Sequence, residues 1–138
     1  MVEVATLERA EGECQADAKQ RAARCRRDEL RRREQDRDLV ARMTLAILEL
    51  FPGCPPQEAR AVAVHTAARG SGRVGRTSAG RALEREALTA AVVAAIRHNH
   101  TRYDRLLMRG WSRIDARDAV RDVIERIIKS WRSLPGRR

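Results

Sequence analysis

The spacing of apolar residues predicts helices along the whole chain. Apolar side chains recur every three or four positions, which places them on one face of an α-helix, and no stretch alternates as a strand would. Helices are expected over residues 38–50, 56–69, 83–100, 103–109 and 113–133. We therefore predict an all-α fold: a compact bundle of about four to five helices over residues 38–134, a long charged helical arm over residues 1–37 and a disordered tail over residues 135–138.

Particular residues mark the breaks between these helices. Phe51-Pro52-Gly53-Cys54-Pro55-Pro56 ends the first core helix, because proline disfavours helical geometry in the residue before it. Thr101 with Asp104, and Ser112 with Asp115, have the spacing of a capping box, in which a hydroxyl and a carboxylate satisfy the first amides of a helix. Two helices are expected to stop at a glycine: Gly70 and Gly110.

The predicted core comes from aliphatic stripes, since aromatic residues make up only 3% of the chain. One apolar face is expected on each longer helix, and their members in chain order are Leu39, Met43, Ala46, Ile47 and Leu50; Ala61, Val62, His65 and Ala68; Leu88, Ala91, Val92, Ala95 and Ile96; and Ala116, Val120, Val123, Ile124, Ile127, Ile128 and Trp131.

Residues 1–37 favour a helix with only a thin apolar stripe and charges of both signs. A helix that is polar nearly all round is solvated, pairs with a partner or frays. We interpret this segment as a solvated helical extension. A basic arm lying on nucleic acid, and a helix that pairs with another protein or with a second copy, are the alternatives.

The formal net charge of +10 is concentrated in one part of the chain. Residues 51–138 contain 18 Lys and Arg against 8 Asp and Glu, whereas residues 1–50 contain 11 of each. A basic domain attracts polyanions such as nucleic acid or an anionic membrane surface. Because 27 of the 29 basic residues are arginine, compositional drift in a GC-rich genome is the alternative explanation.

Two polar stretches carry the candidate functional residues: a glycine–arginine loop over residues 70–78, and a histidine-containing cluster over residues 97–104. Glycine amides can form an anion-binding nest, and an arginine fork can donate two hydrogen bonds to a phosphate. A flexible linker with incidental arginines is the alternative for the loop. The predicted phosphate- and nucleic-acid-binding residues are Arg69, Gly72, Arg73, Gly75, Arg76, Thr77, Arg97, His98, Arg102 and Tyr103.

Among the histidines, His98 is the candidate catalytic residue, because a neutral imidazole beside arginines can serve as an acid or base on a phosphodiester. It could equally bind a phosphate or stack on a base. His65 and His100 are interpreted as packing residues, and Asp104 as a helix cap.

The sequence predicts neither a metal site nor a cofactor. Cys14, Cys25 and Cys54 have neither zinc-ligand spacing nor the pattern of a disulfide framework, so we expect reduced thiols. His98 and His100 are two residues apart, which puts them on different faces of a helix. In an extended turn they could converge and, with His65 and Asp104, supply metal ligands, which is the alternative. With no signal peptide or membrane-spanning run recognised, we expect a cytoplasmic protein without a membrane partner.

Several separated motifs resemble one family. They are Phe51-Pro52, Gly70-Ser71-Gly72-Arg73-Val74-Gly75-Arg76, Arg97-His98-x-x-Thr101-x-Tyr103-Asp104-x-Leu106-Leu107, Ala116-Arg117 and Trp131. In order and spacing they resemble the bacterial and fungal domain-of-unknown-function family numbered 2293, over about residues 50–132, and the chain resembles its actinobacterial members. Many members have a histidine or an alanine ahead of the run that corresponds to Ile96-Arg97-His98, and this chain lacks the histidine, which argues against a metal site there. The resemblance implies a bacterial protein and a shared domain but no established activity.

Three functions are therefore considered. The first is a nucleic-acid-binding module that contacts the phosphate backbone; the few aromatic residues argue against extensive base stacking. The second is a phosphate-directed, nuclease-like enzyme that uses His98 with Arg73 and Arg76. The third is a protein–protein interaction domain that acts through residues 1–37. Enzymatic activity stays open, and the sequence favours the binding role.

Overall fold

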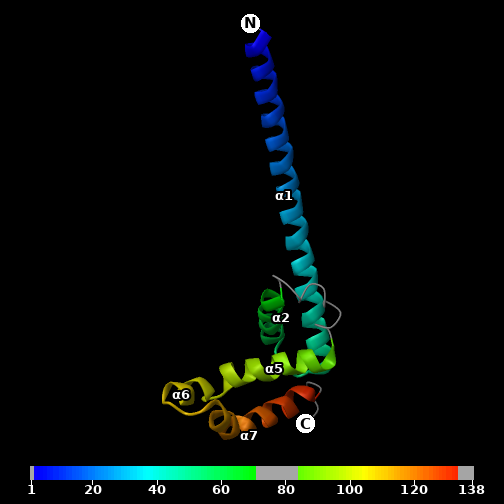
Figure 1. Ribbon diagram of the computed structural model, residues 1–138. Coiled ribbons are helices and arrows are strands. Elements are labelled where there is room, and N and C mark those ends of the chain that lie inside the picture. The colour runs from blue at the N-terminus through cyan, green and yellow to red at the C-terminus, as the bar shows by residue number, and fades with distance from the viewer. Residues whose placement is uncertain (1, 71–83, 134–138) are drawn as a thin grey trace. The chain divides into compact units, whose positions relative to one another are not determined.

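The computed structural model describes the backbone of residues 2–70 and 84–133 (Figure 1). These residues form five helices and no strand: α1 (Val2–Leu50), α2 (Pro56–Gly70), α5 (Arg85–His100), α6 (Tyr103–Met108) and α7 (Arg113–Arg132). The predicted all-α fold is confirmed. Within these two ranges, no helix combines the length and the hydropathy that a membrane crossing requires. The predicted tail over residues 135–138 lies outside the described residues.

The chain divides into two compact units, Met1–Arg37 and Asp38–Arg138. In the first unit, nearly every described side chain is exposed. Ion pairs one helical turn apart join Arg31 to Asp28 at 3.4 Å and Arg33 to Glu29 at 2.8 Å. Such pairs contribute only about 0.2–0.5 kcal/mol each, so the helix here depends mainly on residues with high helix propensity.

In the second unit, α5 is the central helix, with α2 packed against one side and α7 against another (Figure 1). The faces predicted for residues 38–50, α5 and α7 are confirmed, because each of their members is buried or half-buried. The fully buried members of the core are Met43, Ile47, Phe51, Cys54, Ala59, Val62, Ala63, Leu88, Val92, Ile96, Tyr103, Leu106, Ala116, Val120, Ile124, Ile128 and Trp131.

The predicted buried face of α2 was wrong in part. Ala59, Val62 and Ala63 are buried, whereas Ala61 and Ala68 are exposed. His65, which was interpreted as a packing residue, is exposed as well. Alanines occur on all sides of α2, so the sequence pattern alone favours no particular face of this helix.

The turn after α1 contacts the last turn of α7 backbone to backbone. The Gly53 amide donates a hydrogen bond to the Trp131 carbonyl at 2.7 Å. The Phe51 ring is buried, and the Arg132 guanidinium lies 5.7 Å from its centroid. In the same turn, burial and then the nearby Glu58 carboxylate raise the pKa of the Cys54 thiol to about 11, so this thiol stays protonated at neutral pH. This contact fixes the C-terminal end of α7 within the core.

The connection between α6 and α7 follows the predicted stops and caps. Gly110 has a φ of +91°, which a residue with a side chain adopts only with strain. The Ser112 hydroxyl accepts a hydrogen bond from the Asp115 amide at 3.1 Å, and α7 begins at Arg113.

Gly53 leaves no room for a side chain. A Cβ atom built there would lie 2.8 Å from the Ser130 carbonyl oxygen and 2.9 Å from that of Ser133. Because these neighbours are backbone atoms, we expect Gly53→Ala to lower the free energy of unfolding by about 1–3 kcal/mol. Urea denaturation followed by circular dichroism measures this change.

Gly12→Ala is the matched control, since nothing lies within 4 Å of a Cβ built at Gly12. We expect the control to lose no stability, because alanine is a better helix former by about 0.5–1 kcal/mol. Equal stability of Gly53→Ala and the wild type would contradict the close contact with α7.

Candidate functional site

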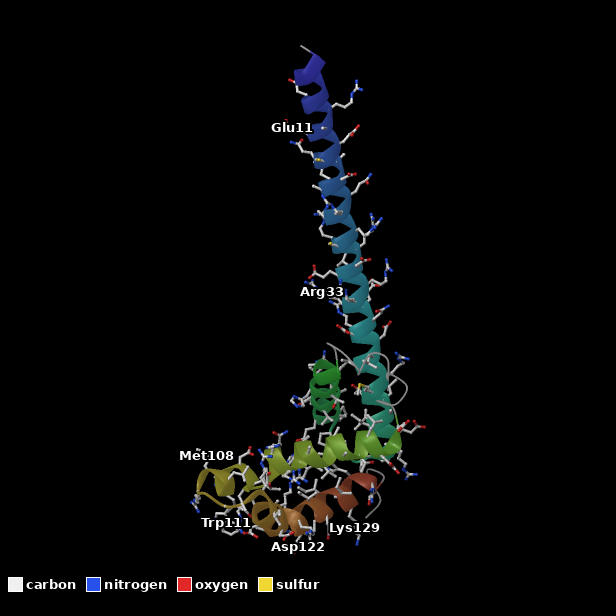
Figure 2. The ribbon with its side chains drawn as sticks, viewed as in Figure 1. Glu11, Arg33, Met108, Trp111, Asp122 and Lys129 are labelled. Atoms are coloured by element: carbon white, nitrogen blue, oxygen red, sulfur yellow. The ribbon has the colours of Figure 1, made fainter. Side chains whose placement is uncertain are left out.

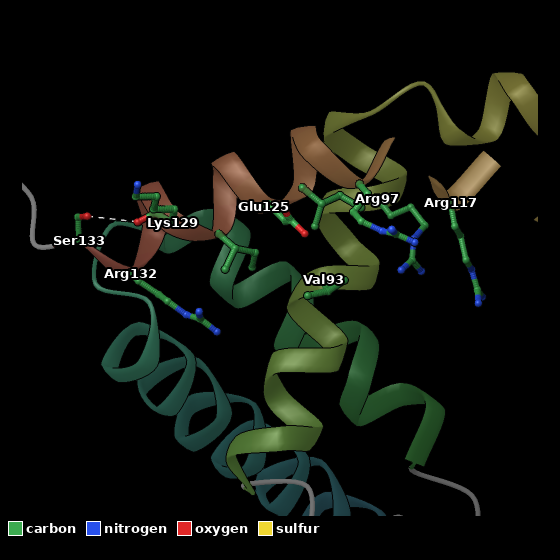
Figure 3. Close-up of a pocket in the computed structure, with 10 residues that line it drawn as sticks. Val93, Arg97, Arg117, Glu125, Lys129, Arg132 and Ser133 are labelled. Atoms are coloured by element: carbon green, nitrogen blue, oxygen red, sulfur yellow. Dashed lines mark hydrogen bonds between the residues drawn. The ribbon is translucent and has the colours of Figure 1, made fainter. Parts of the chain in front are cut away.

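A groove of about 900 Å³ runs between α5 and α7 (Figure 3). The α7 side of the groove is determined by the buried positions of this helix, which are four residues apart: Ala116, Val120, Ile124 and Ile128. Residues one position later on the helix form the adjacent row, which faces the groove. The groove is lined by Val93 and Arg97 from α5 and by Arg117, Arg121, Ile124, Glu125, Ile128, Lys129, Arg132 and Ser133 from α7 and its C-terminal end.

The polar lining of the groove is strongly cationic. Five of the lining residues are Arg or Lys and one, Glu125, is acidic. Figure 3 shows Arg97 and Arg117 at one end of the groove, Lys129 and Arg132 at the other, and Glu125 between them. Arg121 forms an ion pair with Asp118 one turn away. Val93 and the isoleucines of α7 supply apolar surface, so the arrangement suits an extended anion with both charged and apolar parts.

Arg97 is the most constrained of these cations. Its Nε atom is buried and has no hydrogen-bond partner within the described part of the chain. Its guanidinium carbon lies 5.6 Å from the centroid of the buried Tyr103 ring. A buried donor without a partner costs about 1–3 kcal/mol, more than an exposed cation–π contact of about 0.5–1 kcal/mol returns. The position of Arg97 is therefore poorly explained by stability alone.

His98 lies beside Arg97 and contacts an acid. Its Nδ1 is 2.7 Å from Asp104 Oδ1, and its ring meets the Tyr103 ring edge-on with centroids 5.5 Å apart. The interpretation of Asp104 as a helix cap was wrong, because its carboxylate faces His98 and α6 has no side-chain cap. A carboxylate at Nδ1 favours the tautomer that leaves Nε2 as an acceptor, and both side chains are about half exposed.

Thr101 also departs from the predicted capping box. Its hydroxyl accepts a hydrogen bond from the Tyr103 amide at 3.2 Å and donates to the Arg97 carbonyl. It therefore joins the end of α5 to the start of α6, and this link places Tyr103 beside Arg97 and His98.

His100 lies on a different face of α5 from His98, as predicted. Its Nε2 pairs with Glu58 in the first turn of α2, and its ring meets the Trp131 ring edge-on at 5.7 Å. It connects three helices, but His100 itself is exposed and lies outside the buried core, so only its contact with the Trp131 ring agrees with the packing role expected for it. In the described residues, no group of three or more His, Cys, Asp or Glu side chains is placed to hold a metal ion.

Only some of the predicted site residues lie in the described part of the chain. Arg97, His98 and Tyr103 come together, and Arg102 is exposed at the start of α6. Six others have side chains or whole residues outside the described part of the chain: Arg69, Gly72, Arg73, Gly75, Arg76 and Thr77.

The sequence analysis missed the α7 side of the groove. Four cations had not been selected there: Arg117, Arg121, Lys129 and Arg132. The signal for three of them was the four-residue spacing of Arg117, Arg121, Glu125 and Lys129, each directly after a buried position. Arg132 is not part of this series. The prediction that residues 1–37 bind a partner or a second copy stays a prediction.

A family model described as "Uncharacterized conserved protein (DUF2293)" matches residues 46–132. The chain belongs to the DUF2293 family. The match covers α2, α5, α6, α7 and the end of α1, so every groove residue except Ser133 lies inside the DUF2293 domain. The resemblance expected from the sequence is confirmed. Searches of the curated proteins and of the solved structures found no match.

Arg97→Met tests whether this arginine is kept for stability. The change removes the unpartnered donor while keeping an apolar stem, so we expect the free energy of unfolding to rise or to stay within about 1 kcal/mol of the wild type. Urea denaturation provides the measurement. As a control, Ile96→Ala in the adjacent core position should lose about 2–5 kcal/mol. A loss of more than about 2 kcal/mol in Arg97→Met would instead make Arg97 a structural residue.

Proposed function

We propose that this DUF2293 protein binds nucleic acid through the phosphate backbone, in the groove between α5 and α7. The observation that supports the proposal is the lining of that groove, with five cations and one acid. The unpartnered Nε of Arg97 adds to it, because a phosphate oxygen would satisfy such a donor. Its proposed place of action is the bacterial cytoplasm.

The length of the cationic row favours a polyanion over a small anion. Arg117 and Arg132 lie near opposite ends of the groove, and the helix between them rises about 22 Å. One strand of B-DNA carries a charge about every 3.4 Å, so a row of this length follows about six nucleotides. A single phosphate would contact only one end of such a row.

The proposal predicts a salt-dependent affinity that groove cations control. Arg117→Ala/Lys129→Ala removes two groove cations. We expect the slope of log affinity against log salt to become shallower by about 1.8 units for duplex DNA and about 1.4 for a single strand. Fluorescence anisotropy with labelled oligonucleotides over about 50 to 200 mM salt measures it.

Arg60→Ala/Arg126→Ala is the matched control, because it removes the same net charge from exposed positions that do not line the groove. We expect the control to keep nearly the full slope. Equal losses in the two double variants would show that net charge alone attracts nucleic acid. If the wild type showed no salt-dependent binding to oligonucleotides, the proposal would be wrong.

A second candidate function rests on the 2.7 Å contact between His98 and Asp104. A histidine oriented by a carboxylate can act as a general base through its other nitrogen. Nε2 of His98 would take a proton from water as the water oxygen bonds to phosphorus. The bond from phosphorus to the leaving oxygen breaks, and that oxygen takes up a proton. This is the nuclease-like alternative, in which Arg97 holds the phosphate; Arg73 and Arg76 lie outside the described residues.

Denaturing gels of the same binding samples test this second function. If it holds, shortened oligonucleotides appear with the wild type, disappear with His98→Ala and decrease by about 10-fold or more with Asp104→Asn, since the orienting carboxylate is lost. His65→Ala, at an exposed histidine of α2, is the control and should retain the products. Intact oligonucleotides with the wild type would eliminate catalysis and leave the binding proposal in place.

A further inference from the structure

The connection between α6 and α7 exposes three large apolar side chains within seven residues. Met108 is 87% exposed, Trp111 44% and Ile114 74%. Met108 and Trp111 are labelled in Figure 2. The other exposed large apolar residues of the described chain, Leu30, Leu45 and Val64, lie singly on α1 and α2. We call residues 108–114 the elbow. Three exposed apolar side chains this close in sequence make the elbow a candidate binding surface, because exposed apolar patches mark binding sites more often than scattered apolar residues do.

Arginines surround the elbow. Four exposed ones lie at the start of α6, on α6, in the turn after it and at the start of α7, and they are Arg102, Arg105, Arg109 and Arg113. Of the nearby acids, the Asp104 carboxylate faces His98, whereas Asp115 is exposed and donates only its backbone amide, to the Ser112 hydroxyl. Arg113 lies one helical turn before Arg117, so the cations of the elbow continue into the groove. The elbow therefore extends the charged surface and adds apolar contact area to it.

Backbone hydrogen bonds hold the elbow in place, and Met108 and Ile114 stay largely exposed while Trp111 is just over half buried. The Trp111 amide donates to the Leu106 carbonyl at 3.0 Å, and the Gly110 amide to the Leu107 carbonyl at 3.0 Å. Gly110 supplies the positive φ that this geometry needs. Trp111 is thus presented at the surface by a turn that is already formed, which lowers the cost of ordering it when a ligand binds.

We propose that the elbow binds an unpaired base of single-stranded nucleic acid, with the Trp111 ring stacked on the base. Met108 and Ile114 would flank the stack, and the surrounding arginines would hold the adjoining phosphates. The proposal rests on the proposed function and adds a substrate class to it, because only an unpaired base exposes a free face to a side chain. A single exposed tryptophan limits the site to one base, in keeping with the few aromatic residues of the chain.

Substitution of Trp111 separates stacking from charge. We expect Trp111→Leu to weaken binding of an oligouridylate or oligothymidylate by about 5- to 150-fold, because the stack is lost. The salt slope should not change, since no cation is removed. Binding of a duplex of the same length should stay within about 2-fold, and Trp111→Phe should retain most of the single-strand affinity because it keeps an aromatic face.

Two controls accompany these variants. Leu45→Ala, which truncates an exposed apolar side chain on α1, should leave both affinities unchanged. Circular dichroism and urea midpoints establish that Trp111→Leu and Trp111→Phe fold as the wild type does. Because both replacements are apolar and the position is exposed, we expect them to fold.

Specific results would overturn the inference. Equal affinities of Trp111→Leu and the wild type for single strands, or equal losses for single strands and duplexes, would exclude base stacking at the elbow. Nucleic-acid binding in the groove would still be supported if Arg117→Ala/Lys129→Ala made the slope of log affinity against log salt shallower. If Trp111→Leu lost binding to phosphatidylglycerol vesicles but kept its binding to oligonucleotides, the elbow would be a lipid-binding surface. If no oligonucleotide bound the wild type at low salt, the elbow proposal and the proposed function would fail together.

Discussion

The burial of one row of α7 side chains against α5 is the constraint on which the candidate site depends. Val120, Ile124 and Ile128 are each nearly inaccessible to solvent, and burying such a side chain contributes about 1.5–3 kcal/mol. Rotating α7 by one residue would expose this row and bury charges. The direction of the next row, which carries Arg117, Arg121 and Lys129, is therefore set by the apolar packing of α7. These cationic side chains therefore all lie on the helix face that lines the groove.

Contacts at the C-terminal ends of α5 and α7 support this packing. Near the C-terminal end of α7, Gly53 approaches the backbone so closely that its amide bonds to the Trp131 carbonyl. At the C-terminal end of α5, His100 contacts both Glu58 and Trp131, so it joins α2, α5 and α7. A rigid frame of this kind suits a surface that binds an extended, regularly spaced polyanion, because little ordering of the protein is needed on binding.

The sequence predicted the helices and most of the core, since long amphipathic segments such as α5 and α7 repeat a strong apolar spacing. The sequence did not predict the buried face of α2 correctly, because alanines occur on all sides of this helix. His65 was wrongly placed on that face. The sequence pattern assigned Asp104 to a cap because local spacing says nothing about a histidine six residues earlier. The groove was missed for a related reason: α5 and α7 supply opposite walls, and only their packing brings Arg97 to the α7 cations.

An NMR titration tests the groove most directly. The amide spectrum of the isotope-labelled protein would be recorded with increasing amounts of a short oligonucleotide. The account predicts shifts at Val93, Arg97 and the groove-facing residues of α7, with smaller changes in α2 and in residues 1–37. Shifts confined to residues 1–37, or spread evenly over every exposed arginine, would contradict it. Either pattern would mean that the charge of the chain, and not the packing of α7 on α5, determines where a polyanion binds.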